Sequence, residues 1–191
     1  MFVALDLPDE VRQALGEWGR RELTDPALRV IRPEYLHVTL AFLGYRPERD
    51  VERIARILHS TELPAPEIAL VRDPVAVKKG RSPRLFAVDA RSEGTIALQS
   101  DVERRLVAER LYKPEKRPFW PHLTVARVRT EKGSRRGLME VTRPPGPLPE
   151  ELLAPFRGVR LTLYRSTLLR AGAEYDPLAQ VDLPESRAAM R

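Results

Sequence analysis

A stretch of ten residues occurs twice in this chain and constrains its fold more than any other sequence feature. Residues 32–41 read RPEYLHVTLA, and residues 117–126 read RPFWPHLTVA. Both copies contain Arg-Pro, three residues, His, an apolar residue, Thr, an apolar residue and Ala. The two histidines, His37 and His122, are 85 residues apart and are two of the three histidines in the chain. The repeat therefore indicates a chain built from two similar halves.

Apolar residues alternate with His and Thr in each copy, which is the period-two pattern of a β-strand. Successive side chains of a strand point to opposite faces, so His37 and Thr39 share one face. On the other face, we expect Val38, Leu40 and Phe42 to pack in the core. The second copy repeats this pattern. A single His on a strand is usually a structural residue, but two matched His-x-Thr strands favour a site with two imidazoles and two hydroxyls.

Composition limits the kind of molecule that carries this site. With 191 residues and 42% hydrophobic content, we expect one compact domain over residues 1–191. The net charge of +6 favours an anionic partner, although 27 acidic residues are mixed with the 28 Arg and 5 Lys. The absence of Cys excludes disulfides, thiolate nucleophiles and Cys-bound zinc.

Neither a signal peptide nor a membrane span is apparent in the sequence. The first ten residues, MFVALDLPDE, have no basic region before the apolar run and no small-residue cleavage site. No apolar run approaches the roughly 20 residues that a membrane helix needs. We therefore expect a cytoplasmic protein with no membrane association.

Strand-like and helix-like segments follow one another along the whole chain. Strands are expected over 2–7, 28–32, 36–43, 67–71, 74–78, 84–90, 122–128, 159–172 and 174–183. Helices are expected over 8–18, 47–60 and 94–111, with a short helical piece near 149–154. Many strands with a few helices of comparable length predict an α+β fold of two similar lobes.

The flanks of the two His-x-Thr motifs identify a family. RPFWPHLTVARV, LHVTLAFLG and the later LYRSTLLRAGAEYDPL resemble the 2H phosphoesterases, most closely the RNA 2′,3′-cyclic phosphodiesterases once called 2′-5′ RNA ligases. The similarity extends over nearly the whole chain. It implies a bilobed α+β fold with a pseudo-twofold axis, in which two antiparallel-rich sheets with outer helices enclose a central cleft. It also implies which residues line that cleft: His37, Thr39, His122 and Thr124.

The resemblance further implies a substrate and a reaction. The substrate is RNA or a nucleotide that ends in a 2′,3′-cyclic phosphate, and the product carries a 2′-phosphate, with no metal or other cofactor. Ring opening by water requires a base that takes a proton from water and an acid that protonates the departing oxygen. Histidine can hold either role near neutral pH. Residue types do not assign the two roles, but the resemblance makes His37 the proton donor and His122 the proton acceptor.

Other residues near the motifs are candidates for binding the substrate. The hydroxyls of Thr39 and Thr124 can donate to the phosphate oxygens and stabilise charge in the transition state. Tyr35 and Trp120, each two residues before a His, either stack on a base or pack in the core. Arg127 could contact the phosphate, but it has the wrong parity for the His face unless a bulge intervenes.

Alternative functions share parts of this pattern. A ligase that joins a cyclic phosphate to a 5′-hydroxyl would use the same residues in reverse. A non-catalytic RNA-binding or nucleotide-binding module has no need of two matched proton-transfer groups. A metal-dependent phosphodiesterase is a poorer interpretation, because there is no HExxH motif and catalytic zinc usually has three protein ligands. No obligate protein partner is expected.

The first prediction is that catalysis needs no metal ion. Two histidines can carry out both proton transfers unaided, so turnover of a 2′,3′-cyclic nucleotide should persist in excess chelator. The measurement is the initial rate with and without the chelator. Activity that disappears with the chelator and returns with a divalent ion would contradict the His/His mechanism.

Overall fold

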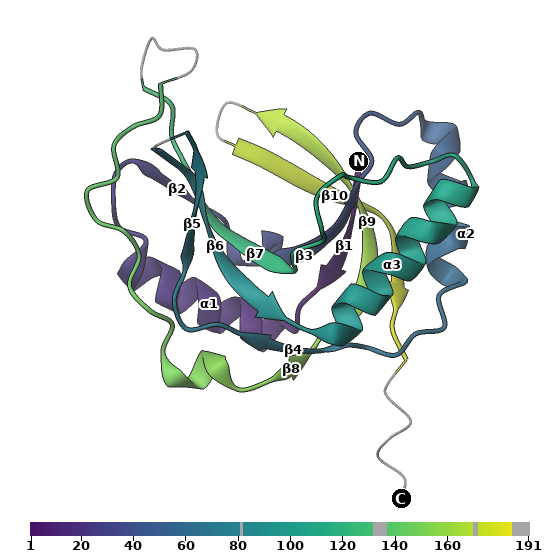
Figure 1. Cartoon of the computed structure of the whole chain (residues 1–191), viewed down its shortest axis with the longest axis horizontal. Coiled ribbons are helices and arrows are strands. Elements are labelled where there is room, and N and C mark those ends of the chain that lie inside the picture. Colours follow the sequence, from purple (N-terminus) through teal and green to yellow (C-terminus); the bar gives the residue numbers. More distant parts are fainter. Residues whose placement is uncertain (81, 132–136, 170–171, 185–191) are drawn as a thin grey trace, which may run out of the picture.

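The computed structural model describes the chain except residues 81, 132–136, 170–171 and 185–191 (Figure 1). The strands of the described part are β1 (Phe2–Asp6), β2 (Leu28–Val30), β3 (His37–Phe42), β4 (Glu67–Leu70), β5 (Val75–Lys79), β6 (Ser82–Arg91), β7 (His122–Val128), β8 (Phe156–Arg157), β9 (Arg160–Leu169) and β10 (Gly172–Asp182). Its helices are α1 (Asp9–Glu22), α2 (Val51–His59) and α3 (Glu93–Ala108), with 3-10 turns η1 (Pro33–Tyr35), η2 (Glu48–Asp50) and η3 (Glu150–Leu153). The expected strands and helices are thus confirmed, with small shifts of their ends, although residues 170–171 of the strand expected over 159–172 lie outside the described residues.

The described strands form one antiparallel sheet in the order β10-β9-β1-β3-β7-β6-β4-β8, with β2 paired to β7 and β5 paired to β6. The expected α+β fold with two halves is confirmed. The two sheets that we expected are, however, joined into one. The join is a single pair, Val38 of β3 opposite Leu123 of β7, and both side chains are completely buried. Burial of these two apolar side chains holds the two halves together where the His strands meet.

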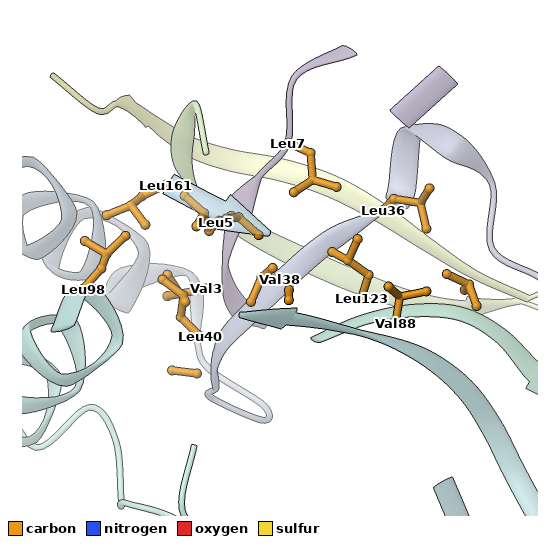
Figure 2. Close-up of a cluster of buried hydrophobic side chains, with 14 of the residues drawn as sticks. Val3, Leu5, Leu7, Leu36, Val38, Leu40, Val88, Leu98, Leu123 and Leu161 are labelled. Atoms are coloured by element: carbon orange, nitrogen blue, oxygen red, sulfur yellow. The ribbon is translucent and has the colours of Figure 1, made fainter. Parts of the chain in front are cut away.

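The helices cover the outer face of the sheet (Figure 1). Helix α2 packs against β9, β10 and α3, and α3 also contacts β3. Helix α1 lies beside η1, and its Trp18 indole donates a hydrogen bond of 3.0 Å to the Pro147 carbonyl. Figure 2 shows the core beneath these helices, where Val3, Val38 and Leu123 belong to β1, β3 and β7. The apolar residues of both His strands therefore face the helices.

Both His strands contain a β-bulge immediately after the Thr. The extra residue is Leu40 in β3, as seen from its register with β1, and Val125 in β7, as seen from its register with β6. A one-residue bulge reverses the alternation of side chains beyond it. Phe42 and Arg127, which occupy equivalent places in the repeat, therefore lie on the same face as the His and Thr side chains. The expectation that Phe42 packs in the core is wrong, since 58% of its surface is exposed.

Candidate active site

A cleft of about 450 Å³ lies on the face of the sheet opposite the helices. His37 and Thr39 reach it from β3, and His122 and Thr124 reach it from β7. The structure thus brings together the four side chains that the repeat singled out. Tyr35 and Arg127 also line the cleft, and further lining residues come from β1, β2, β9 and β10.

The two imidazole rings are held in the same way. Nδ1 of His37 lies 2.7 Å from the carbonyl oxygen of Tyr35, and Nδ1 of His122 lies 2.8 Å from the carbonyl oxygen of Trp120. A carbonyl oxygen only accepts, so Nδ1 carries the hydrogen in each neutral ring. The lone pair then resides on Nε2 in both histidines. Nε2 of His37 lies 3.1 Å from Oγ1 of Thr39, whose hydroxyl donates to it.

His37 is surrounded by aromatic rings on its own half of the sheet. Its ring stacks on Phe2 at 4.9 Å between centroids, and Tyr164 and Tyr175 lie at 5.9 and 5.6 Å. Burial lowers the pKa of His37 to about 4, although the hydrogen bond to Tyr35 favours the charged form. His37 is therefore neutral at pH 7 in the free protein.

His122 has a different neighbour. Its ring stacks on the Trp120 indole, with 4.2 Å between centroids, and the indole N–H donates to Oδ1 of Asp89 at 2.9 Å. Burial lowers the pKa of His122, whereas the Trp120 carbonyl and the Asp89 carboxylate raise it. Trp120 is not among the residues that line the cleft, so its position suits orientation of His122 better than stacking on a base.

Tyr35 and Arg127 both line the cleft, Tyr35 just before β3 and Arg127 within β7. Tyr35 contacts the Tyr175 ring at 4.8 Å, and the Arg32 guanidinium lies 4.2 Å from the Tyr35 ring centre. Arg127 is half-buried and, by its charge, lowers the pKa of both histidines of the cleft. The bulge in β7 is what brings Arg127 to this face, because a regular strand would have turned it into the core.

Sequence reasoning missed two carboxylates beside the histidines. Asp6 lies opposite His37 in the β1–β3 ladder, and Asp89 lies opposite His122 in the β6–β7 ladder. The signal was present as a second repeat, because these residues end the similar segments FVALD (2–6) and LFAVD (85–89). Each His is therefore opposite an Asp in the neighbouring strand.

Asp6 anchors a buried polar network below His37. Its carboxylate accepts hydrogen bonds from the Thr162 hydroxyl at 2.7 Å and the Tyr164 hydroxyl at 3.0 Å, and Arg12 lies 3.3 Å away. Burial raises the pKa of Asp6. Burial and the nearby Asp6 charge raise the pKa of Tyr164 to about 12, so this phenol stays a hydrogen-bond donor. The network fixes the Tyr164 ring against His37.

The described residues contain no cluster of three or more His, Asp or Glu side chains that could hold a metal ion. The third histidine, His59, lies at the end of α2 and is not part of the cleft lining. Within the described ranges, no helix is both long and apolar enough to cross a membrane.

Comparison with known proteins identifies the family of the chain. The family model described as 2′-5′ RNA ligase superfamily matches residues 7–167. The chain belongs to the 2′-5′ RNA ligase superfamily. The matched segment contains both His-x-Thr strands of this superfamily member.

Individual relatives and solved structures are similar to this superfamily member over much of its length. An RNA 2′,3′-cyclic phosphodiesterase of Thermus thermophilus is 34% identical over 133 residues, which cover 66% of this chain and 67% of the relative. A crystal structure of a T. thermophilus protein superposes with a TM-score of 0.77 at 27% identity, covering 97% of this chain and 98% of the other. Escherichia coli LigT complexed with 3′-AMP gives a TM-score of 0.71 at 26% identity, covering 95% and 96%.

The second prediction concerns the charge of the two histidines in the free protein. Because the pKa of His37 is about 4, its imidazolium should appear only as the pH falls well below the ordinary range of histidine. The unfolded chain takes up that proton earlier, so His37 costs stability as the pH falls below about 6.5. Ring-proton NMR titration of both histidines measures this directly.

The Asp89→Asn variant provides the matched comparison for this titration. Removing the carboxylate charge should lower the pKa of His122 further and leave that of His37 nearly unchanged, because Asp89 acts on His122. An ordinary titration of His37 near pH 6.5 would show that the aromatic surroundings do not desolvate it.

Proposed function

We propose that this chain hydrolyses a 2′,3′-cyclic phosphate at the end of RNA or of a nucleotide to a 2′-phosphate. The observation that carries the proposal is the pair of matched imidazoles, each with Nδ1–H held by a backbone carbonyl, which leaves Nε2 as the nitrogen that can transfer a proton. The name of the T. thermophilus relative, RNA 2′,3′-cyclic phosphodiesterase, supports the same reaction. So does the net charge of +6, which suits an anionic substrate.

In the proposed reaction, Nε2 of His122 takes a proton from water while the water oxygen attacks phosphorus. The bond from phosphorus to the 3′ oxygen breaks, and His37 gives its Nε2 proton to that oxygen. Thr39 and Thr124 donate hydrogen bonds to the non-bridging oxygens, where charge increases in the transition state. The phosphate remains attached at the 2′ position, and the two histidines have exchanged one proton with water and sugar.

The charge state of the site has to change when substrate binds. A proton donor must be protonated, yet burial keeps His37 neutral in the free protein at pH 7. An anionic phosphate near the ring favours the imidazolium and raises its pKa. The same phosphate offsets the charge of Arg127, which lowers the pKa of both histidines. His37 therefore takes up a proton from solvent when the anionic substrate binds.

A ligase is the second candidate, because the family description names 2′-5′ RNA ligases. In ligation a 5′-hydroxyl would attack phosphorus in place of water, the bond to the 3′ oxygen would break in the same way, and the same two histidines would transfer the protons. Water is present at far higher concentration than any RNA end, which favours hydrolysis. A module that only binds nucleotides would have no use for two Nε2 atoms presented to one cleft.

The test of the proposed function is product identification. The purified protein should convert a uridine 2′,3′-cyclic phosphate and an RNA that ends in a cyclic phosphate to products with a 2′-phosphate. Phosphorus NMR and sensitivity to a 3′-specific phosphatase distinguish the 2′ from the 3′ product. A 3′-phosphate product, or no turnover of either substrate, would overturn the proposal.

A further prediction assigns the two histidines. On a cyclic phosphate, His37→Ala and His122→Ala should each reduce turnover by at least about 100-fold, because each removes one proton transfer. A 3′-deoxynucleoside 2′-(4-nitrophenyl phosphate) has a leaving group that departs without a proton. On that substrate His37→Ala should be much less harmful than His122→Ala, as measured by nitrophenolate release.

His59→Ala serves as the matched control, since His59 lies outside the cleft and should not affect either substrate. The opposite ranking of the two variants would exchange the proposed roles. Equal and severe losses on the activated substrate would mean that His37 does something other than acid catalysis.

A further inference from the structure

A side pocket of about 210 Å³ opens from the catalytic cleft between β2, β7 and the start of β10. The two spaces are continuous, because they share six lining residues: Arg29, Ile31, Tyr35, Arg127, Ala173 and Tyr175. The proposed reaction uses His37, Thr39, His122 and Thr124, and none of these lines the side pocket. The side pocket is therefore available for a part of the substrate that does not react.

The most unusual feature of the side pocket is a pair of facing arginines. Arg29 of β2 lies directly opposite Arg127 of β7 in the antiparallel ladder. Like charges at directly opposite positions of a sheet destabilise it. Both side chains are half-buried, and within the described residues neither guanidinium has an ion-pair or hydrogen-bond partner. An anion between them would remove the repulsion.

The other charged groups of the side pocket do not neutralise this pair. Arg32 lies over the Tyr35 ring and forms an ion pair of 3.3 Å with Glu34. Glu174 is exposed and is the one carboxylate among the described residues that line the side pocket. The pocket is thus basic, and the planar guanidinium fork matches the oxygens of a phosphate better than an ammonium does.

The position of the pair relative to the histidines indicates which phosphate it meets. Along β7, His122, Thr124 and Arg127 lie on the cleft face in that order, and Arg29 lies beside Arg127 on β2. Arg127 is near enough to lower the pKa of both histidines, so it borders the reacting group. Arg29 is the next group in the row, beyond the position of the cyclic phosphate.

We propose that Arg29 binds the phosphodiester on the 5′ side of the terminal nucleotide, the linkage to the rest of the RNA. This proposal rests on the proposed function. A terminal nucleotide bears two phosphates, the cyclic one and the one at its 5′ oxygen. With the cyclic phosphate at the His and Thr side chains, the 5′ phosphate is the remaining anion within reach of the side pocket. Arg29 then distinguishes an RNA end from a free nucleoside cyclic phosphate.

The kinetic test compares uridine 2′,3′-cyclic phosphate with the dinucleotide that carries one more uridine at its 5′ side. The wild-type protein should have the higher kcat/KM for the dinucleotide. Arg29→Met should reduce kcat/KM for the dinucleotide by about 10-fold, the usual worth of one charged hydrogen bond, and leave the mononucleotide within about 2-fold. Arg29→Lys keeps the charge but loses the planar guanidinium, so its kcat/KM for the dinucleotide should lie between those of the wild type and Arg29→Met.

A matched control removes a positive charge elsewhere. Arg56 is exposed on α2, outside both the cleft and the side pocket, so Arg56→Met should change kcat/KM for neither substrate. Equal losses on the two substrates in Arg29→Met would place Arg29 on the reacting phosphate and overturn the proposal. No loss on either substrate would overturn it as well. Thermal unfolding shows that the variant folds, and removal of the Arg29–Arg127 repulsion should leave its Tm unchanged or raised.

A binding measurement separates this proposal from the proposed function. Uridine 2′,5′-bisphosphate and uridine 2′-monophosphate are titrated calorimetrically into the wild-type protein and into Arg29→Met, which needs no turnover. The variant should lose about 10-fold in affinity for the bisphosphate only. If that result is obtained in a protein without turnover, the subsite survives and the proposed hydrolysis fails. If Arg29→Met binds both ligands as the wild type does, the subsite proposal fails whatever the activity.

Discussion

The buried contact between Val38 and Leu123 is the constraint on which the site depends. It is the single residue pair of the β3–β7 ladder, and it joins the two halves of the sheet. Because side chains alternate along a strand, burying these two residues turns their neighbours His37 and His122 to the opposite face. The hydrophobic effect behind the sheet thus sets the arrangement of the two imidazoles in front of it. A shift of one half against the other at this pair would change the separation of His37 and His122.

Within each half, the orientation of the imidazole is set by residues next to it in the sequence. The carbonyl that holds Nδ1 belongs to the residue two positions earlier, and the same contact occurs in both copies. The repeat therefore encodes the ring orientation together with the ring. The bulge after each Thr is likewise repeated, and it presents one further side chain to the cleft, Phe42 in one half and Arg127 in the other. These equivalent positions thus carry an apolar ring in one half and a cation in the other.

The two histidines occupy equivalent places in the repeat, but their neighbouring side chains differ. His37 lies among Phe2, Tyr164 and Tyr175, whereas His122 stacks on Trp120, which is bonded to Asp89. A difference of one pKa unit corresponds to about 1.4 kcal/mol between protonation states. Burial among rings therefore gives His37 a strong preference for the neutral form, which an anionic substrate has to overcome. The two halves thus hold matched imidazoles in unequal electrostatic surroundings.

The sequence by itself determined the strands, the pairing of the two motifs and the family, because alternation and repetition are properties of neighbouring residues. It also contained the Asp6 and Asp89 positions, in the similar segments FVALD and LFAVD. It did not determine the bulges. Strict alternation along a regular strand places Phe42 in the core and Arg127 away from the cleft, and each bulge reverses that alternation. Only the tertiary structure decided that the sheet is continuous and that Arg29 faces Arg127. These features depend on which strands pair and in which register, and that choice is made by packing between segments far apart in the chain.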